Sequence, residues 1–255
     1  MKNNPIIPKL TLVGAGPGDP DLITIKGIKA IASADVILYD ALVNTDLLKY
    51  ASARAKIIFV GKRAGYASYT QQQINELIIE HALTSGHVVR LKGGDPFIFG
   101  RGYEELEYAQ IFNIPVEVIP GISSHTSVPA LQHIPLTKRG INESFWVLTG
   151  TNAAGTIPRD VYRAAESNAS VVILMGLSRL KEIAQIFIDA GKASLPAAVI
   201  QNGSLPDEKI VVSDAAQIYT KTIEANISSP AIIIFGEVVS LHPLAKKIFT
   251  EELRK

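Results

Sequence analysis

Residues 91–102 of the chain read LKGGDPFIFGRG and follow an apolar run over Val88–Leu91 that is typical of a buried strand. After Lys92, that run is followed by the pair Gly93–Gly94 and the turn-forming Asp95-Pro96. Glycines at the carboxyl end of a strand leave the backbone bare, so amides and carbonyls can press against a ligand. Arg101 precedes a predicted helix, where a guanidinium can bind carboxylates through two hydrogen bonds. The stretch therefore predicts a small polar ligand at a sheet edge, beside an acidic group.

The composition indicates a well-packed protein of one or two domains. The chain has 255 residues, of which 47% are hydrophobic and 19% charged, so it can bury a large core and is not disordered. A net charge of +1 gives no global field for nucleic acid, so acidic ligands must be bound locally. The absence of cysteine excludes disulfides and thiolate metal sites. We see no signal peptide and no run near the ~18–20 apolar residues of a membrane span, and expect a cytoplasmic protein.

The first half of the chain alternates short aliphatic runs with amphipathic stretches. This pattern predicts repeated βα units and a mainly parallel sheet covered by helices. One helix is predicted over Gln71–Thr84, because Thr70 and Gln73 form a T-x-x-Q capping box and Gly86 follows. The expected strands are Leu10–Val13, Val36–Tyr39, Lys56–Val60, Val88–Leu91 and Val116–Ile119.

The pattern lapses near residue 134, where IPLTKRGINES mixes proline, glycine and charge. We predict an N-terminal α/β domain over residues 1–134, a linker over 135–144 and a C-terminal α/β domain over 145–255. Only NGSLPDE separates the strands expected at Ala197–Gln201 and Lys209–Ser213, so these strands should form an antiparallel hairpin in a mixed sheet. Further strands are expected at Phe145–Leu148, Val171–Leu174 and Ala231–Phe235, and helices at Ser178–Ala190 and Ala215–Glu224.

The loop GAGPGDP, residues 14–20, follows the first expected strand and invites comparison with a dinucleotide fingerprint. The G-x-G-x-x-G pattern requires a third glycine where this chain has Asp19, and Pro17 removes one amide from a phosphate cradle. The loop is either an ordinary strand-to-helix turn or, as we prefer, a ligand-lining loop without phosphate recognition.

Several polar residues follow the carboxyl ends of expected strands. Asp40 follows the second strand, where it either caps a following helix or places a carboxylate able to accept a proton. Lys62 and Arg63 follow the third strand, and such surface cations are usually only solvated. Together with Gly93–Asp95 and Arg101, however, these residues converge on the edge where open parallel sheets bind ligands. The convergence favours a functional site.

Four more residues have an ordinary structural interpretation, and two of them also have a functional one. Ser123 and Ser124 follow the fifth strand and either cap the next helix or bind a ligand carboxylate at its amino end. Met175 after a strand is typical of core filling, and Gly203 of a hairpin turn. The five histidines show no metal-ligand spacing, and no G-x-S-x-G indicates a serine hydrolase.

Taken together, the motifs resemble the tetrapyrrole methylase family over essentially the whole chain. GAGPGDPDLITIKG, YDALV, VGKRAG, LKGGDPFIFGRG, IPGISS, IPLTKR, LMGL and SPAIIIFGEVV occur in the family's order. GAGPGDP is moderately specific, whereas VGKRAG with LKGGDPFIFGRG is similar to the branch that methylates uroporphyrinogen III. The resemblance implies two α/β domains with S-adenosylmethionine in the cleft between them, usually in a homodimer, and no metal.

The resemblance also implies roles for individual residues. Asp40 corresponds to a proposed proton acceptor and Lys62 to a proposed proton donor. The cofactor contacts fall on Pro17, Gly93, Gly94, Asp95, Ile98, Ser123, Ser124, Met175 and Gly203. The substrate's carboxylates call for a local cationic rim, for which the candidates besides Lys62 are Arg63, Arg101, Lys138 and Arg139.

The implied reaction is methylation of uroporphyrinogen III at C2 and C7 to give precorrin-2, with S-adenosylhomocysteine released in each round. A methyl sulfonium is already strongly electrophilic, so the protein chiefly supplies proximity and in-line orientation. Positive charge builds on the macrocycle during attack, and the Asp40 carboxylate would stabilise that charge before accepting a proton.

Three positions depart from the family's common pattern, and three alternatives stay open. Ser123-Ser124 stands where Thr-Ala is common, and Lys138 replaces a histidine. The alternatives are a methylase of a later corrin precursor, a nucleotide-dependent oxidoreductase, which Pro17 and Asp19 disfavour, and a non-catalytic cofactor-binding module.

Overall fold

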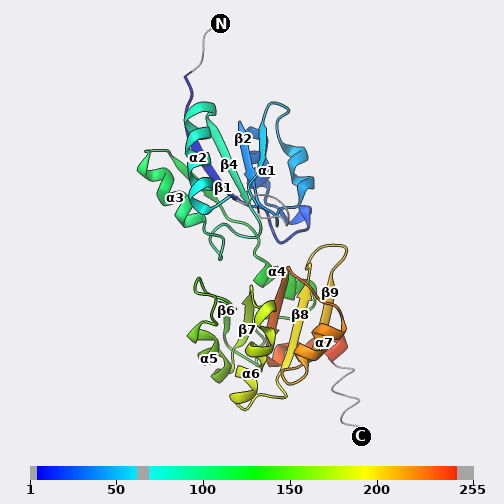
Figure 1. Ribbon diagram of the computed structural model, residues 1–255. Coiled ribbons are helices and arrows are strands. Elements are labelled where there is room, and N and C mark those ends of the chain that lie inside the picture. Colours follow the sequence, from blue (N-terminus) through cyan, green and yellow to red (C-terminus); the bar gives the residue numbers. More distant parts are fainter. Residues whose placement is uncertain (1–4, 62–68, 246–255) are drawn as a thin grey trace. The chain divides into compact units, whose positions relative to one another are not determined.

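The structure is a computed structural model that describes residues 5–61 and 69–245. Its internal contacts divide the chain into two units, residues 1–123 and 124–255, each with its own five-stranded sheet (Figure 1). Each expected strand is present within one residue at either end, which confirms the α/β class. No helix in the described parts of the chain is both long and apolar enough to cross a bilayer.

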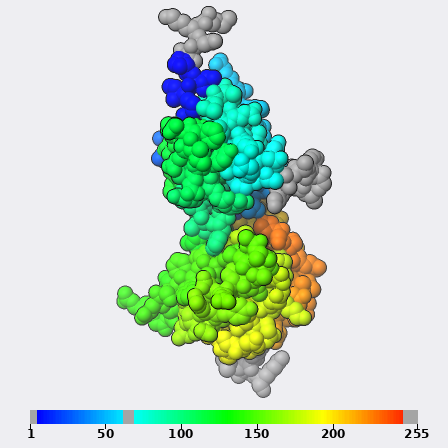
Figure 2. Space-filling model, turned by 60° about the vertical axis from the view of Figure 1, so that its left-hand side comes forward, coloured from blue at the N-terminus to red at the C-terminus, as the bar shows by residue number. Residues whose placement is uncertain are grey.

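The first unit is a parallel sheet with strand order β3-β2-β4-β1-β5. Its apolar residues alternate between two cores, one under α2 and α3 and the other under α1 and the 3-10 helix η2. Figure 2 shows the side chains of α2 (teal) and α3 (green) side by side over one face. The elements are β1 Lys9–Gly14, α1 Ile25–Ser33, β2 Val36–Tyr39, η2 Thr45–Tyr50, β3 Lys56–Phe59, α2 Gln71–Ser85, β4 His87–Lys92, α3 Gly102–Ile111 and β5 Val116–Ile119.

Helix α2 begins as its sequence predicts. The Thr70 hydroxyl accepts from the Gln73 amide at 3.2 Å, and the Gln73 side chain accepts from the Thr70 amide at 2.8 Å. Gly86 ends the helix with a φ of 113°, a conformation that favours glycine. The capping box and the glycine stop are thus both confirmed.

The second unit is a mixed sheet with strand order β6-β7-β10-β8-β9. Strands β6 and β7 are parallel, whereas β10 runs antiparallel to both of its neighbours. Strands β8 and β9 form the expected antiparallel hairpin. The elements are α4 Ser124–Leu131, β6 Phe145–Thr149, α5 Arg159–Glu166, β7 Ser170–Leu174, α6 Leu180–Asp189, β8 Pro196–Gln201, β9 Lys209–Asp214, α7 Ile218–Glu224 and β10 Ala231–Phe235.

The division by contacts falls after Ser123, ahead of the 135–144 segment that the sequence suggests as a linker. Helix α4 belongs to the second unit because its Val128 is buried in that unit's core, together with Ile134 just after the helix. The loop that follows is ordered by Asn142, whose amide donates to the carbonyls of Leu136 and Ser144 and to the Ser170 hydroxyl. The division concerns contacts alone, and the domain linker over residues 135–144 stays a prediction.

The topology of the first sheet places its ligand-binding edge between β1 and β4. The chain leaves β1 toward β2 on one side and leaves β4 toward β5 on the other. In open α/β sheets such a switch in direction, at the carboxyl ends of the strands, marks the ligand site. The register aligns these ends, since Gly14 pairs with Lys92 and Tyr39 with Leu91. The loops GAGPGDP and GGDPFIFGRG therefore start side by side.

Candidate active site

Backbone from three loops packs together at the switch point. The Gly94 amide donates to the Gly16 carbonyl at 2.7 Å, and the Gly16 amide donates back at 3.2 Å. A Cβ at Gly14 would collide with the backbone of Gly121, and a Cβ at Gly121 with the Gly94 carbonyl oxygen. Glycine is thus needed at Gly14 and Gly121 to let the loops after β1, β4 and β5 meet, a requirement that the sequence analysis missed.

The two glycines of the GGDP turn differ in what surrounds them. A Cβ at Gly93 would lie 2.6 Å from the Cβ of Leu42, so the missing side chain serves packing within the protein. Gly94 has a φ of 67°, and a Cβ built there meets no atom within 4 Å. Open space beside a bare backbone is what close approach of a ligand requires. Gly94 therefore fits a cofactor contact on the structure's own geometry.

The Asp95 carboxylate holds the GGDP turn in place through hydrogen bonds to backbone amides. Its Oδ1 accepts from the amides of Phe97 at 2.9 Å and Ile98 at 3.3 Å. Its Oδ2 accepts from the Gly121 amide at 3.1 Å, which ties the turn to the loop after β5. Both oxygens already have a partner, so this side chain preorganises the loop.

An exposed apolar surface follows the turn. Ile98 is 40% exposed, and Phe97 and Phe99 are similarly exposed. Exposed apolar side chains beside open backbone suit the mixed character of small-molecule sites. On the other loop of the switch point, Pro17 is half-buried and Gly18 accepts a hydrogen bond from the Asn44 side chain at 2.9 Å.

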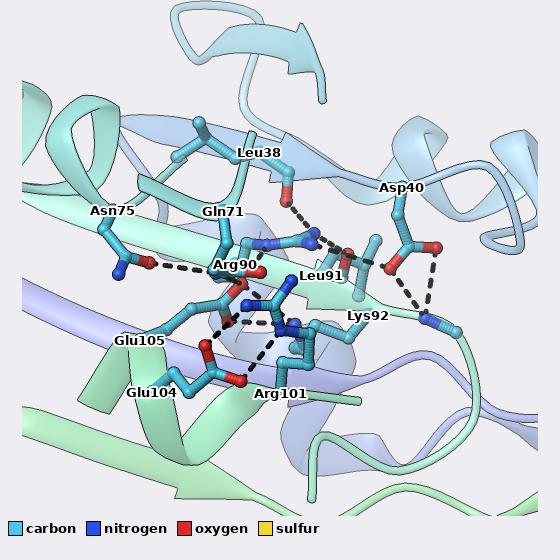
Figure 3. Close-up of polar contacts among 11 residues, drawn as sticks. Leu38, Asp40, Gln71, Asn75, Arg90, Leu91, Lys92, Arg101, Glu104 and Glu105 are labelled. Carbon is cyan, nitrogen blue, oxygen red and sulfur yellow. Dashed lines mark hydrogen bonds and ion pairs between the residues drawn. The ribbon is translucent and has the colours of Figure 1, made fainter. Parts of the chain in front are cut away.

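Asp40 does not cap a helix, so the structural interpretation of this residue is wrong in its detail. Its Oδ1 accepts from the Leu42 amide at 3.0 Å in an Asx turn, and η2 begins only at Thr45 with Asn44 as its cap. The Gly93 amide lies 3.3 and 3.4 Å from the two carboxylate oxygens, and an Arg90 nitrogen lies 3.7 Å away (Figure 3). The side chain is 25% exposed and links the ends of β2 and β4.

A buried charged cluster lies behind Asp40 and was not anticipated. Glu105 of α3 has no exposed side-chain surface, and it accepts from Arg90 Nε at 3.1 Å and from Lys92 Nζ at 2.9 and 3.0 Å (Figure 3). Burial and the neighbouring Arg90 charge lower the pKa of Lys92, and Glu105 opposes that shift. One sequence signal could have indicated this cluster: the R-x-K spacing in β4 places both cations on one face of the strand.

The expected cationic rim is only partly visible. Arg101 forms a bidentate pair with Glu104, with distances of 2.8 and 2.6 Å, and this hydrogen bonding raises the pKa of Arg101. A substrate carboxylate would have to compete with Glu104 for this guanidinium. Lys62 and Arg63 lie outside the described residues. Lys138 and Arg139 are exposed in the turn after α4.

In the second unit, Met175 is not part of the core. It follows β7 with a φ of 53° and is 55% exposed, so the core-filling interpretation is wrong. Its carbonyl accepts from the Thr151 hydroxyl at 3.3 Å, and the Gly150 amide donates to the Leu174 carbonyl at 2.7 Å. The loops after β6 and β7 thus hold Met175 in an exposed position.

Gly203 is not explained by the backbone angles of a turn. The positive φ angles of this hairpin belong to Asn202 and Ser204, whereas a Cβ at Gly203 would collide with the Val128 side chain of α4. The glycine lets the hairpin pack on α4, whose first residue is Ser124. Ser123, the last residue of the first unit, is buried.

Open backbone at the switch point of a parallel sheet, beside a carboxylate, is the arrangement that open α/β proteins use to bind small polar ligands. The described residues contain no group of three or more His, Asp or Glu side chains arranged to hold a metal. The model of the tetrapyrrole (corrin/porphyrin) methylases matches residues 9–219, and this chain belongs to that family.

Three of the proteins similar to this chain have the names of tetrapyrrole methyltransferases. Uroporphyrinogen-III C-methyltransferase of Methanocaldococcus jannaschii is 43% identical over 235 residues, which are 91% of this chain and 97% of the relative. A crystal structure of uroporphyrin-III C-methyl transferase from Thermus thermophilus, complexed with S-adenyl homocysteine, superposes with a TM-score of 0.78 at 35% identity, covering 91% and 94% of the two chains. Cobalt precorrin-4 methyltransferase superposes with a TM-score of 0.82 at 27% identity, covering 91% and 95%.

Some relatives are longer and match this chain over only part of their length. It spans 64% of a chloroplastic methyltransferase from Arabidopsis thaliana and 44% of a siroheme synthase from Psychrobacter cryohalolentis.

Proposed function

We propose that this protein transfers methyl groups from S-adenosylmethionine to uroporphyrinogen III, at C2 and C7, to give precorrin-2. The observation that carries the proposal is the open, left-handed backbone of Gly94 at the switch point of the parallel sheet. It occurs in a chain that is 43% identical to an enzyme with this substrate in its name.

The proposed cofactor contacts fall on residues of both units. In the first unit these are the Gly93–Asp95 turn with Ile98, Pro17 and Ser123, and in the second they are Ser124, Met175 and Gly203. Gly94 allows close approach of the ligand, Ile98 offers an apolar surface, and Asp95 fixes the turn through its two bonded oxygens. S-adenosylmethionine, when bound, supplies an electrophilic methyl group.

Asp40 is the proposed proton acceptor and Lys62 the proposed proton donor. Attack by a pyrrole carbon places positive charge on the macrocycle, which a nearby carboxylate stabilises before it takes up the departing proton. Asp40 is partly exposed at the sheet edge and is held from behind by Arg90 and the Gly93 amide. The carboxylate is therefore oriented before the substrate arrives.

Arg63, Arg101, Lys138 and Arg139 are proposed to bind the substrate's carboxylates. Arg101 already binds one carboxylate through two hydrogen bonds, that of Glu104, which demonstrates the geometry that a substrate carboxylate would use. The protein is further proposed to act in the cytoplasm as a homodimer. Sedimentation velocity at micromolar concentration tests the dimer, and a single monomer boundary contradicts it.

Incubation with uroporphyrinogen III and S-adenosylmethionine tests the function, with products identified by mass spectrometry and by NMR with a labelled methyl group. We expect two methyl additions per macrocycle, at C2 and C7. An unchanged macrocycle would contradict the proposal.

A methylase of a later corrin precursor is a second candidate, because the cobalt precorrin-4 enzyme superposes with a TM-score of 0.82. Its sequence identity of 27% is lower than the 35% shared with the Thermus thermophilus enzyme. Competition between uroporphyrinogen III and cobalt precorrin-4 in one reaction separates the two. Methylation of only the latter would establish the second candidate.

A further inference from the structure

The charged cluster behind Asp40 connects three elements of the first unit. Glu105 of α3 accepts hydrogen bonds from Arg90 and Lys92 of β4, and from the Gln71 side chain of α2 at 3.3 Å. Every described buried polar side-chain atom has a hydrogen-bond partner. A fully satisfied network of this kind holds its members in one arrangement.

The charges of the cluster balance only if Asp40 is included. Arg90 and Lys92 bring two positive charges, and Glu105 brings one negative charge into the same buried space. Asp40 is the second anion. It lies 3.7 Å from Arg90 and is the partly exposed member of the charged cluster. Since an uncompensated buried charge is costly, the state of Glu105 affects how strongly Arg90 engages Asp40.

Arg90 also contacts the backbone of both strands that carry the site. Its Nη1 donates to the Leu91 carbonyl at 2.9 Å and lies 3.4 Å from the Leu38 carbonyl. Leu38 is two residues before Asp40, and Leu91 is two residues before Gly93. The guanidinium therefore sets the spacing between the ends of β2 and β4, where the proton acceptor and the cofactor turn begin (Figure 3).

We propose that Glu105 is a positioning residue for methyl transfer: it fixes Arg90 and Lys92, and through Arg90 it orients the Asp40 carboxylate beside the Gly93 amide. The inference rests on the proposed function, because Asp40 acts in turnover only if that function holds. Glu105 itself touches neither substrate nor cofactor in this account. Its effect passes through Arg90.

The substitution Glu105→Gln tests the inference, since glutamine keeps the size of the side chain and removes its charge. With one buried anion gone, the two cations of β4 both depend on Asp40, and the carboxylate is displaced. We expect kcat for methylation to fall on the order of 10²-fold, the effect of small misplacement at a reacting centre. Glu107→Gln on the exposed face of the same helix is the matched control and should keep wild-type turnover.

A double-mutant cycle separates positioning from a loss of stability. Adding Glu105→Gln to Asp40→Asn should lower turnover less than about threefold below that of Asp40→Asn alone. The reason is that the group that Glu105 positions is already inactive in Asp40→Asn. A merely structural role would lower turnover by the same factor with and without Asp40. Equal factors would overturn the inference.

Restoring the charge balance gives a second readout. Lys92→Met added to Glu105→Gln leaves Arg90 opposite Asp40, with no net charge, so turnover should recover at least about tenfold over Glu105→Gln alone. If Glu105→Gln is unfolded at the assay temperature, Lys92→Met replaces the wild type as the starting protein of the cycle. Asp40→Asn is then introduced both into Lys92→Met and into the double variant Glu105→Gln/Lys92→Met, and the two losses of turnover are compared. A further fall on adding Lys92→Met would contradict the proposal.

Different results refute the proposed function and the proposed role of Glu105. Absence of methylation by the wild-type protein refutes the proposed function. Wild-type methylation with Glu105→Gln indistinguishable from Glu107→Gln refutes only the role of Glu105.

Discussion

At Asp40, one carboxylate meets three partners: the Leu42 amide, the Gly93 amide and the Arg90 guanidinium. The first is a local turn contact that asparagine can also make, because its side-chain oxygen accepts a hydrogen bond. The other two contacts depend on charge or on two available oxygens. Asp40 thus both stabilises a local turn and places a negative charge at the sheet edge. Substitution by asparagine keeps the turn contact and removes the charge.

Asp40→Asn should therefore lower turnover on the order of 10²–10⁴-fold, the range for a positioned acid or base. Loss of the ion pair with Arg90 should also lower stability by about 1 kcal/mol, since the pair is long and partly exposed. Methylation kinetics and thermal melting check the two effects. Near-wild-type turnover would leave Asp40 a structural residue only.

The open space beside Gly94 can be tested by introducing a side chain there. Valine at Gly94 would project into the open space beside the turn, and we expect binding of S-adenosylhomocysteine to be lost in a calorimetric titration. The left-handed φ adds a strain of roughly 1–2 kcal/mol. Gly191→Val is the matched control, because Gly191 has a similar φ of 79° and an equally open Cβ direction beyond α6. It should bear the same strain and keep binding.

If both variants are folded by circular dichroism and both bind S-adenosylhomocysteine as the wild type does, the ligand does not closely approach the Gly94 backbone. Loss of binding in both would indicate an effect of strain on the fold rather than contact with the ligand.

At the level of elements, the strands were predictable because each is a short aliphatic or aromatic run, and most end at or before a glycine, a proline or a polar residue. Helix α5 was missed, since it has only eight residues and its buried positions Val161, Ala164 and Ala165 are its main signal. The helix expected after Asp40 was wrong, because Asn44 caps the following 3-10 helix instead. Asp40 instead contacts the Gly93 amide and Arg90, and these tertiary contacts could not be predicted from local sequence.

The candidate site was predictable to a different degree. The sheet edge followed from topology, because loops after parallel strands must meet there. The partners of Arg90 and Lys92 were not predictable, since Glu105 is on another element and its burial depends on how α3 packs on the sheet. The pairing of Arg101 with Glu104 was local, and an i, i+3 spacing could have indicated it.

Glu117 supplies a pH-dependent prediction for the edge strand β5. Its carboxylate bonds Lys26 of α1 at 2.7 Å and Lys9 of β1 at 2.8 Å, and these bonds lower its pKa from 4.5 to about 2. Because the charged form is favoured in the folded protein, the stabilisation is complete above about pH 4.5 and is lost as pH falls toward 2. Exposure of the side chain limits the effect to about 1 kcal/mol or less.

Glu117→Gln should thus melt below the wild type at pH 7, and the difference should vanish near pH 2. Thermal melting across this range, with Glu107→Gln as an exposed control, measures it. A difference that is constant over the whole range would show that the ion pairs contribute nothing that depends on the charge of Glu117.

At the scale of the whole molecule, the fold is two α/β units whose candidate cofactor residues are divided between them. Gly93–Asp95 belongs to the first unit, and Met175 and Gly203 belong to the second. If a single ligand is held by both sets, its binding must protect backbone amides in both units. Hydrogen exchange measures this directly, because a ligand that binds the folded state slows local opening.

We expect S-adenosylhomocysteine to slow exchange in the loops around Gly16 and Gly94 and also around Met175 and Gly203. Gly94→Val, which alters only the first unit, should then abolish protection in the second unit as well, because both depend on one bound molecule. Protection that survives around Met175 in this variant would mean that the two units bind ligand independently. Protection confined to one unit in the wild type would contradict a shared site and return the second unit's residues to a structural role.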